Sequence, residues 1–149
     1  MNPLDDKGTE ILDRSECLRL LGSVPVGRVA FTSDALPSVQ PVTFVLHDHH
    51  VVFRTRPGSK LDAASRNAIV AFEVDEYDVR THTGWSVTVV GPAAVVTDGT
   101  RLDELAKLPL RPWAPGELEH FVTISIEIVH GRRIADTGKH HGMQIGESA

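Results

Sequence analysis

The spacing of hydrophobic positions changes near residue 25 and divides the chain into two regimes. Apolar residues recur at helical spacing over residues 12–21, where Asp13 or Ser15 can cap the start and Gly22 ends the pattern. From Gly27 onward the period becomes two, which predicts strands. The expected strands are 27–32, 39–46, 51–55, 70–75, 85–96 and 122–128, with short helices at 59–66 and 98–108.

Short turns join these strands, and few helices interrupt them, so the chain is not a βαβ series. The pattern predicts a mostly β fold, a six-stranded antiparallel barrel with small flanking helices. Gly91-Pro92 indicates a bulge or bend inside the long strand. One domain over residues 11–136 suffices, and we expect poorly ordered polar tails at residues 1–10 and 137–149.

Two predicted strand segments, 39–46 and 87–90, are apolar on both faces. Only one face of a barrel strand points inward, so the outer face of each segment needs a cover. A second copy of the chain is the simplest cover and predicts a homodimer. The alternative is cover by the chain's own helices.

Composition narrows the possible partners. The chain has 41% hydrophobic and 23% charged residues, a globular composition, and its net charge is −5 with scattered basic residues, which argues against nucleic acid. No apolar run is long enough to span a membrane, and the polar start lacks the order of a secretory signal. We therefore expect a cytoplasmic protein, in which the lone Cys17 is a buried small hydrophobe.

Residues 53–60 carry the clearest candidate chemistry. They run from a strand end through a Pro-Gly turn into a helix start, where free N–H groups favour an anion. Arg54 can grip two phosphate oxygens, Lys60 adds a compact charge, and Thr55 and Ser59 add hydroxyl donors. A phosphomonoester would use all of these groups. The alternative is an ordinary turn with solvated basic residues.

Other polar groups have simpler interpretations. His47, His49 and His50 at a hairpin tip are expected to be solvated turn residues, without a metal site. Asp75, with the acidic residues that follow it, is expected to be a solvated strand end. His82 has no assigned role.

Five short motifs occur in an order that resembles the pyridoxamine-phosphate-oxidase-like split-barrel flavoproteins. They lie at residues 27–31, 37–44, 53–60, 70–75 and 84–91. The resemblance implies a Greek-key split barrel, a dimer, and an FMN site in the groove between subunits. It assigns the FMN phosphate to Arg54, Thr55, Ser59 and Lys60. It also places three residues along the isoalloxazine edge: Pro41, Val42 and Thr43.

Two tryptophans are candidates for contact with the flavin ring. Trp85 can wall the ring, with Ser86 beside it, or can be a plain core residue. Trp113, in a loop between prolines, can close over the ring or seal the end of the barrel.

The end of the chain departs from true pyridoxamine-phosphate oxidases. Those enzymes grip substrate with an Arg–His pair, whereas here Arg132 and Arg133 are followed by no matching His. The chain is more similar to small reductases of the superfamily that use FMN or a deazaflavin. We expect an oxidoreductase acting on a small organic acceptor, with no assigned catalytic side chain. The alternatives are a flavin or haem carrier or sensor, and a barrel that has lost its cofactor.

Overall fold

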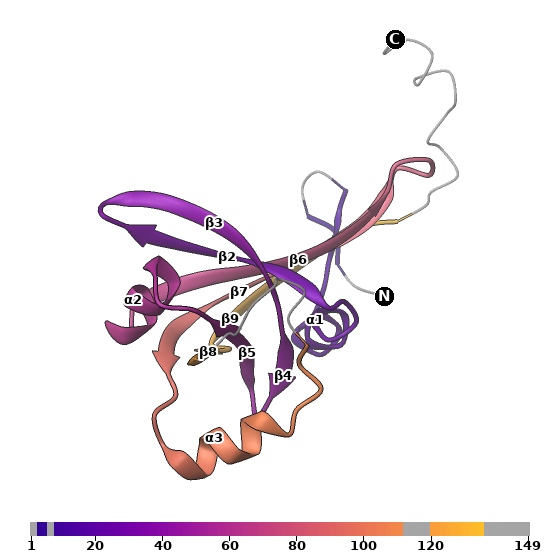
Figure 1. Ribbon diagram of the computed structural model, residues 1–149. Helices are drawn as coiled ribbons and strands as arrows, with labels where there is room; N and C mark the ends of the chain where they lie inside the picture. The colour runs from indigo at the N-terminus through magenta and orange to yellow at the C-terminus, as the bar shows by residue number, and fades with distance from the viewer. Residues whose placement is uncertain (1–2, 6–7, 112–119, 136–149) are drawn as a thin grey trace.

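The computed structural model describes residues 3–5, 8–111 and 120–135, and these residues form a curled antiparallel sheet with three helices (Figure 1). The helices are α1 (Arg14–Leu21), α2 (Ser59–Ser65) and α3 (Gly99–Ala106). The strands are β1 (Glu10–Ile11), β2 (Val26–Ser33), β3 (Leu36–Thr43), β4 (Val45–His47), β5 (His50–Thr55), β6 (Ile69–Asp78), β7 (Thr83–Val95), β8 (His120–Ser125) and β9 (Ile128–Ile134). No helix in these ranges is long and apolar enough to cross a bilayer.

The strand order is β3-β2-β6-β7-β8-β5-β4, and β9 pairs with β7 and with β1. Every pairing is antiparallel. This arrangement confirms the predicted mostly β split barrel. We call the strands β1, β9, β7, β6, β2 and β3 the larger half, and β7, β8, β5 and β4 the smaller half.

Strand β7 belongs to both halves. Its first part pairs with β6 and β9, and after Pro92 it pairs with β8 through Ala93–Val95. Gly91 lies at the change of partner, where a Cβ atom would overlap with the carbonyl oxygen of Ser125. The predicted bend at Gly91-Pro92 is therefore the point where the sheet turns from one half to the other.

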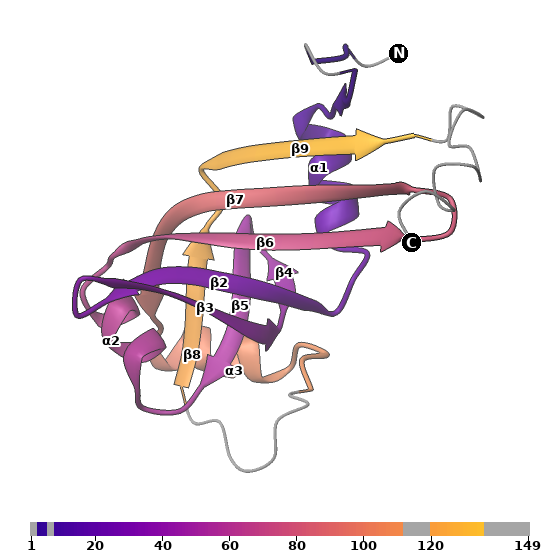
Figure 2. The ribbon, with the colours of Figure 1, turned by 90° about the horizontal axis from the view of Figure 1, so that it is seen from above.

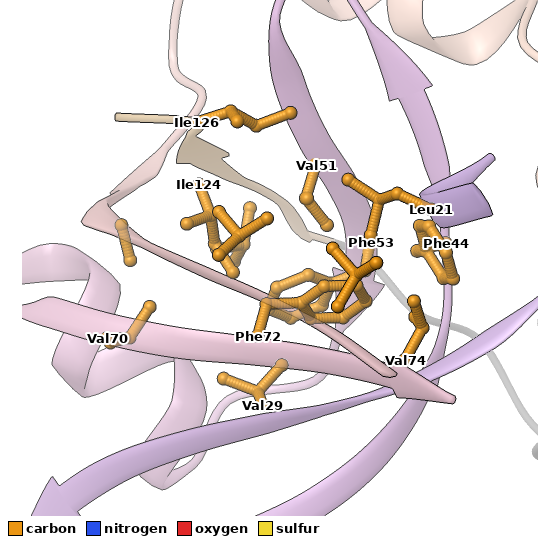
Figure 3. Packing of buried hydrophobic residues seen from close by; sticks show 14 of the residues in the cluster. Leu21, Val29, Phe44, Val51, Phe53, Val70, Phe72, Val74, Ile124 and Ile126 are labelled. Carbon is orange, nitrogen blue, oxygen red and sulfur yellow. The ribbon is translucent and has the colours of Figure 1, made fainter. Parts of the chain in front are cut away.

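The inner face of the curled sheet holds one continuous hydrophobic core (Figure 3). The rings of Phe44 and Phe72 meet edge to face, with centroids 4.7 Å apart and planes at 71°. This geometry is favourable for aromatic pairs. Completely buried side chains from helix α1 and from both halves of the sheet surround them: Leu21, Val51, Val74, Val87, Val89, Val122 and Ile124.

All three helices lie on the same side of the strands β2, β3, β6 and β7 (Figure 1). Helix α1 is capped by Asp13, one of the two caps expected from the sequence, and its carboxylate accepts from the Glu16 N–H at 2.8 Å. Its buried Cys17 fits over Gly131 of β9, where a Cβ atom would collide with the sulfur. Helix α3 covers a second small cluster beneath the smaller half through Leu105. None of these three helices lies on the opposite face of the larger half, as far as the described residues extend (Figure 1).

The described residues contain nine strands, three more than the six expected. The expected strand 39–46 divides at Phe44, because the chain crosses there from the larger half to the smaller one. The expected strand 122–128 ends at Ser125, and a separate β9 begins at Ile128. Hydrophobic alternation continues through both corners, so the sequence pattern does not reveal them.

We predict that Gly91→Ala lowers the free energy of unfolding by about 3 kcal/mol, because backbone must move to admit the methyl group. Urea denaturation measures the change. Gly99→Ala is the matched control: its Cβ meets nothing within 4 Å, and the change should stay within about 0.5 kcal/mol. Equal stability of the two variants would contradict the close approach.

Candidate functional site

Arg54 lies near the end of β5, on the face that points toward α3. It is paired in register with Phe121 of β8, and its guanidinium carbon lies 5.0 Å from the centre of that ring. This is a cation–π distance. The Nε of Arg54 is buried and has no hydrogen-bond partner among the described residues. A buried cationic N–H without an acceptor departs from the rule that buried polar groups are hydrogen-bonded, so this guanidinium is a candidate for contact with a bound group.

Lys60, in the first turn of α2, contacts the edge strand β3. Its Nζ donates to Oε1 of Gln40 at 2.5 Å. Partial burial lowers the pKa of the Lys60 ammonium. Gln40 pairs in register with Val29, so its side chain points to the inner face of the sheet. Sequence analysis missed Gln40, although a lone amide on the core-facing positions of β3 is a signal that could have found it.

The charges of these two cations are not compensated within the described part of the chain. Neither Arg54 nor Lys60 has a carboxylate within ion-pair distance there. By contrast, Arg28 and Arg133 form ion pairs. Half-buried cations without anionic partners are typical of a site that receives an anionic ligand.

The hydroxyl candidates lie close to the same turn. Ser59 is the first residue of α2, and the helix cap at Gly58 makes no side-chain hydrogen bond. Thr55 is buried, and its Oγ1 donates to the carbonyl oxygen of Arg56 at 3.1 Å. Among the described residues, no hydrogen bond, ion pair or ring contact joins Arg54 to Lys60.

The three residues expected along a flavin ring follow Gln40 on β3 and alternate between faces. Val42 packs against the core, whereas Pro41 and Thr43 point to the outer face, in register with Arg28 and Val26. The hydrogen bond from Lys60 to Gln40 therefore brings the start of α2 next to Pro41, Val42 and Thr43 of β3.

Trp85 and Ser86 lie elsewhere on the sheet. Trp85 is 9% exposed and belongs to the core cluster, and it also lines an open cavity of about 800 Å³ beside the end of β9. Ser86 points outward in the same cross-strand row as Thr43, with Val26 and Asp75 between them. Two intervening strands separate Ser86 from Thr43 by about 14 Å. Trp113 lies outside the described residues.

A polar cluster on the outer face was not anticipated. Nη1 of Arg28 lies 3.0 Å from Oε1 of Glu73 and 3.3 Å from Oδ2 of Asp75. Burial and the neighbouring Asp75 raise the pKa of Glu73 to about 7. Asp75 is therefore not a solvated strand end, because its side chain is only 27% exposed and is ion-paired. Alternation along β2 and β6 puts these three side chains on one face, a signal present in the sequence.

Metal binding finds no support in the described ranges, where no group of three or more His, Cys, Asp or Glu could hold an ion.

Known proteins share this architecture. The family profile described as pyridoxamine 5'-phosphate oxidase matches residues 13–133. An uncharacterized protein of Mycobacterium tuberculosis is 43% identical over 128 residues, 83% of this chain and 84% of that protein.

Solved structures with 30% identity or more to this chain are similar to it in fold, and two of them are named as FAD-binding proteins. The FAD binding protein from Mycobacterium smegmatis is 38% identical, with a TM-score of 0.69 over 84% of this chain and 99% of that one. An FAD-binding protein from Mesorhizobium loti is 30% identical, with a TM-score of 0.71 over 85% and 99% of the two chains.

We predict that Gln40→Glu raises the pKa of Lys60, because a carboxylate beside the ammonium favours its charged form. The titration can be followed by carbon NMR of isotopically methylated lysines, with Lys60→Met assigning the signal. Gln40→Ala is the control and should leave the pKa lowered. A Lys60 titration that is the same in the Gln40→Glu variant and the wild type would show that the contact is absent in solution.

Proposed function

Because the chain belongs to the pyridoxamine 5'-phosphate oxidase family, we propose that it binds a flavin through the phosphate on the ribityl chain. The observation that supports this most directly is the pair of half-buried cations, Arg54 and Lys60, that lack a carboxylate partner among the described residues.

The residues present fit a phosphate group. The orphaned Nε of Arg54 can donate to one phosphate oxygen, and Lys60 can donate to another while its contact with Gln40 holds it in place. The uncapped start of α2 at Ser59 adds N–H and hydroxyl donors. Phosphate binding would remove the cost of keeping two cations partly buried without an anion.

FMN is the ligand we propose first, because its terminal phosphomonoester carries the most charge. A deazaflavin shares the phosphate and ribityl chain and is the alternative that these residues do not exclude. FAD is a second candidate, favoured by the two relatives that are named as FAD-binding proteins. Its inner phosphate is joined to the ribityl chain by an ester bond and to the second phosphate by an anhydride bond, so it carries one negative charge where the FMN phosphate can carry two.

We further propose that the protein is an oxidoreductase for a small organic acceptor. The flavin, when bound, supplies the hydride or electron transfer. The role of this chain is to bind the phosphate and to orient the ring along Pro41, Val42 and Thr43. The absence of the expected Arg–His pair after Gly131 argues against pyridoxamine phosphate as the substrate.

We also propose that the protein forms a homodimer through the outer face of the larger half. The outer face of the larger half carries a row of apolar residues that continues across five strands: Val39, Ala30, Ala71, Val90 and Ile128. Val39 is 63% exposed and Ile128 51% exposed at the two ends of this row, which we call the apolar row. A second copy would cover it and would form the other wall of a cofactor groove.

We predict that Arg54→Ala combined with Lys60→Ala weakens FMN binding at least about tenfold, because charged hydrogen bonds contribute about 1.5–3 kcal/mol each. Quenching of flavin fluorescence on titration measures the dissociation constant. Binding of riboflavin, which lacks the phosphate, should change little.

Arg66→Ala is the matched control for this experiment, because it removes an exposed cation at the other end of α2. It should leave FMN affinity unchanged. The phosphate assignment is wrong if the double variant binds FMN as tightly as the wild type. Comparison with FAD shows which flavin the site prefers.

We also predict that Val39→Asp combined with Ile128→Asp produces a monomer, because two charges would enter the covered face. Both positions are exposed in the single chain, so folding should be retained. Sedimentation velocity measures the state of assembly. Val79→Asp, at an 84% exposed position on the β6–β7 turn, is the control and should leave a dimer. A dimer that persists in the double variant would exclude this face.

A further inference from the structure

The cluster of Arg28, Glu73 and Asp75 lies on the helix-free face of the larger half, directly beside the apolar row. We propose that this triad couples self-association of the chain to proton binding, so that two copies associate more tightly when Glu73 is protonated. This inference rests on the dimer proposed above and adds a regulatory property to it.

The geometry concentrates charge at one point. A single nitrogen of Arg28 serves both carboxylates, at 3.0 Å from Glu73 and 3.3 Å from Asp75. The two carboxylates are two residues apart on β6 and therefore share a face. With both ionised the triad carries one net negative charge, and with one proton shared between them it is neutral.

Burial favours the neutral form. Already in the single chain, desolvation and the neighbouring Asp75 raise the pKa of Glu73 to about 7. A covering subunit would remove more water and raise the pKa further. The associated form would then hold more protons than the free chain, so association weakens as the pH rises above about 7 and is strongest below it.

Few other ionisable groups face the triad. In the cross-strand row of Glu73, β3 contributes Pro41, β7 contributes Thr88 and β9 contributes His130. In the row of Asp75 the corresponding residues are Thr43, Ser86 and Arg132. Among these described neighbours only His130 and Arg132 have basic side chains, and both lie two strands away from the carboxylates. The guanidinium of Arg132 is already ion-paired with Asp5, at 3.5 Å.

A second copy is the occupant that best matches this face. A two-fold axis through the patch can set Arg28 of one copy against Glu73 and Asp75 of the other, so that the patch complements itself. The adjoining apolar row supplies hydrophobic area to the same contact. With one proton shared between Glu73 and Asp75 the triad has no net charge, so a strongly basic or strongly acidic partner gains no net attraction from it.

The test compares association of the full chain at pH 6.5, 7.5 and 8.5 at constant ionic strength. Sedimentation velocity over a dilution series gives the dissociation constant. If the dimer persists at the lowest concentration, the dissociation constant cannot be measured in this way. The rate of subunit exchange is then measured instead, between two populations that carry different labels at the amino terminus. We expect the dissociation constant, or the exchange rate, to rise about tenfold or more from pH 6.5 to pH 8.5.

Three substitutions show which group is responsible for the pH dependence. Glu73→Gln keeps the shape of the protonated side chain, so association should stay tight and become independent of pH. His130→Gln removes the imidazole in the same cross-strand row, and it should leave the dependence intact. Asp75→Asn is a second probe of the triad, because without its neighbour's charge Glu73 should ionise more readily and the midpoint should move to lower pH.

The outcomes separate the two proposals. A chain that is monomeric at every pH would overturn the dimer and this inference with it. A dimer whose affinity is the same at pH 6.5 and 8.5, or one whose dependence survives Glu73→Gln and disappears with His130→Gln, would overturn the proton coupling alone.

Discussion

The sharing of β7 between two halves of the sheet is the constraint on which this fold depends. A strand that pairs with β6 and β9 and then with β8 must bend sharply, and it bends where Gly91 passes under the Ser125 carbonyl. The bend wraps both halves around one core, with Phe44 and Phe72 at its centre (Figure 3). Seen from above, the long strands β6, β7 and β2 run side by side and β8 and β5 cross them (Figure 2). The described helices lie on the core side and beneath the smaller half, and none of them covers the outer face of the larger half (Figure 1).

Electrostatics distinguishes two regions of the molecule. On the outer face and around α1, arginines meet carboxylates, as in Arg28 with Glu73 and Arg133 with Glu16. At the β5–α2 turn the cations instead meet a ring and an amide, in Arg54 over Phe121 and Lys60 beside Gln40. Neutral contacts position a side chain without cancelling its charge. That contrast is the physical basis for proposing an anionic ligand at one region and a contact between copies at the other.

Hydrophobic periodicity and local residue chemistry predicted most of this architecture. The features that they missed share one cause, because each depends on contacts between residues that are distant in the sequence or on a change of sheet. Period-two alternation identified the strands, and the cap at Asp13 and the bend at Gly91 followed from residue chemistry. The breaks at Phe44 and after Ser125 were missed, because a chain that turns between two halves keeps its alternation. Gln40 was missed because its partner Lys60 is distant in sequence, and the register that brings α2 to β3 is a property of the folded sheet. Alternation shows that Arg28 and Glu73 each point outward, but the register that sets them side by side is again a property of the folded sheet.

The packing of α1 against β9 has a consequence for chemical probing. Cys17 is the only thiol in the chain, it is 1% exposed, and burial raises its pKa, so the reactive thiolate is scarce in the closed structure. Thiol reagents can therefore reach it only when the helix lifts from the strand. The rate of alkylation thus reports the opening of this one contact, and the native cysteine serves as a built-in probe of local unfolding.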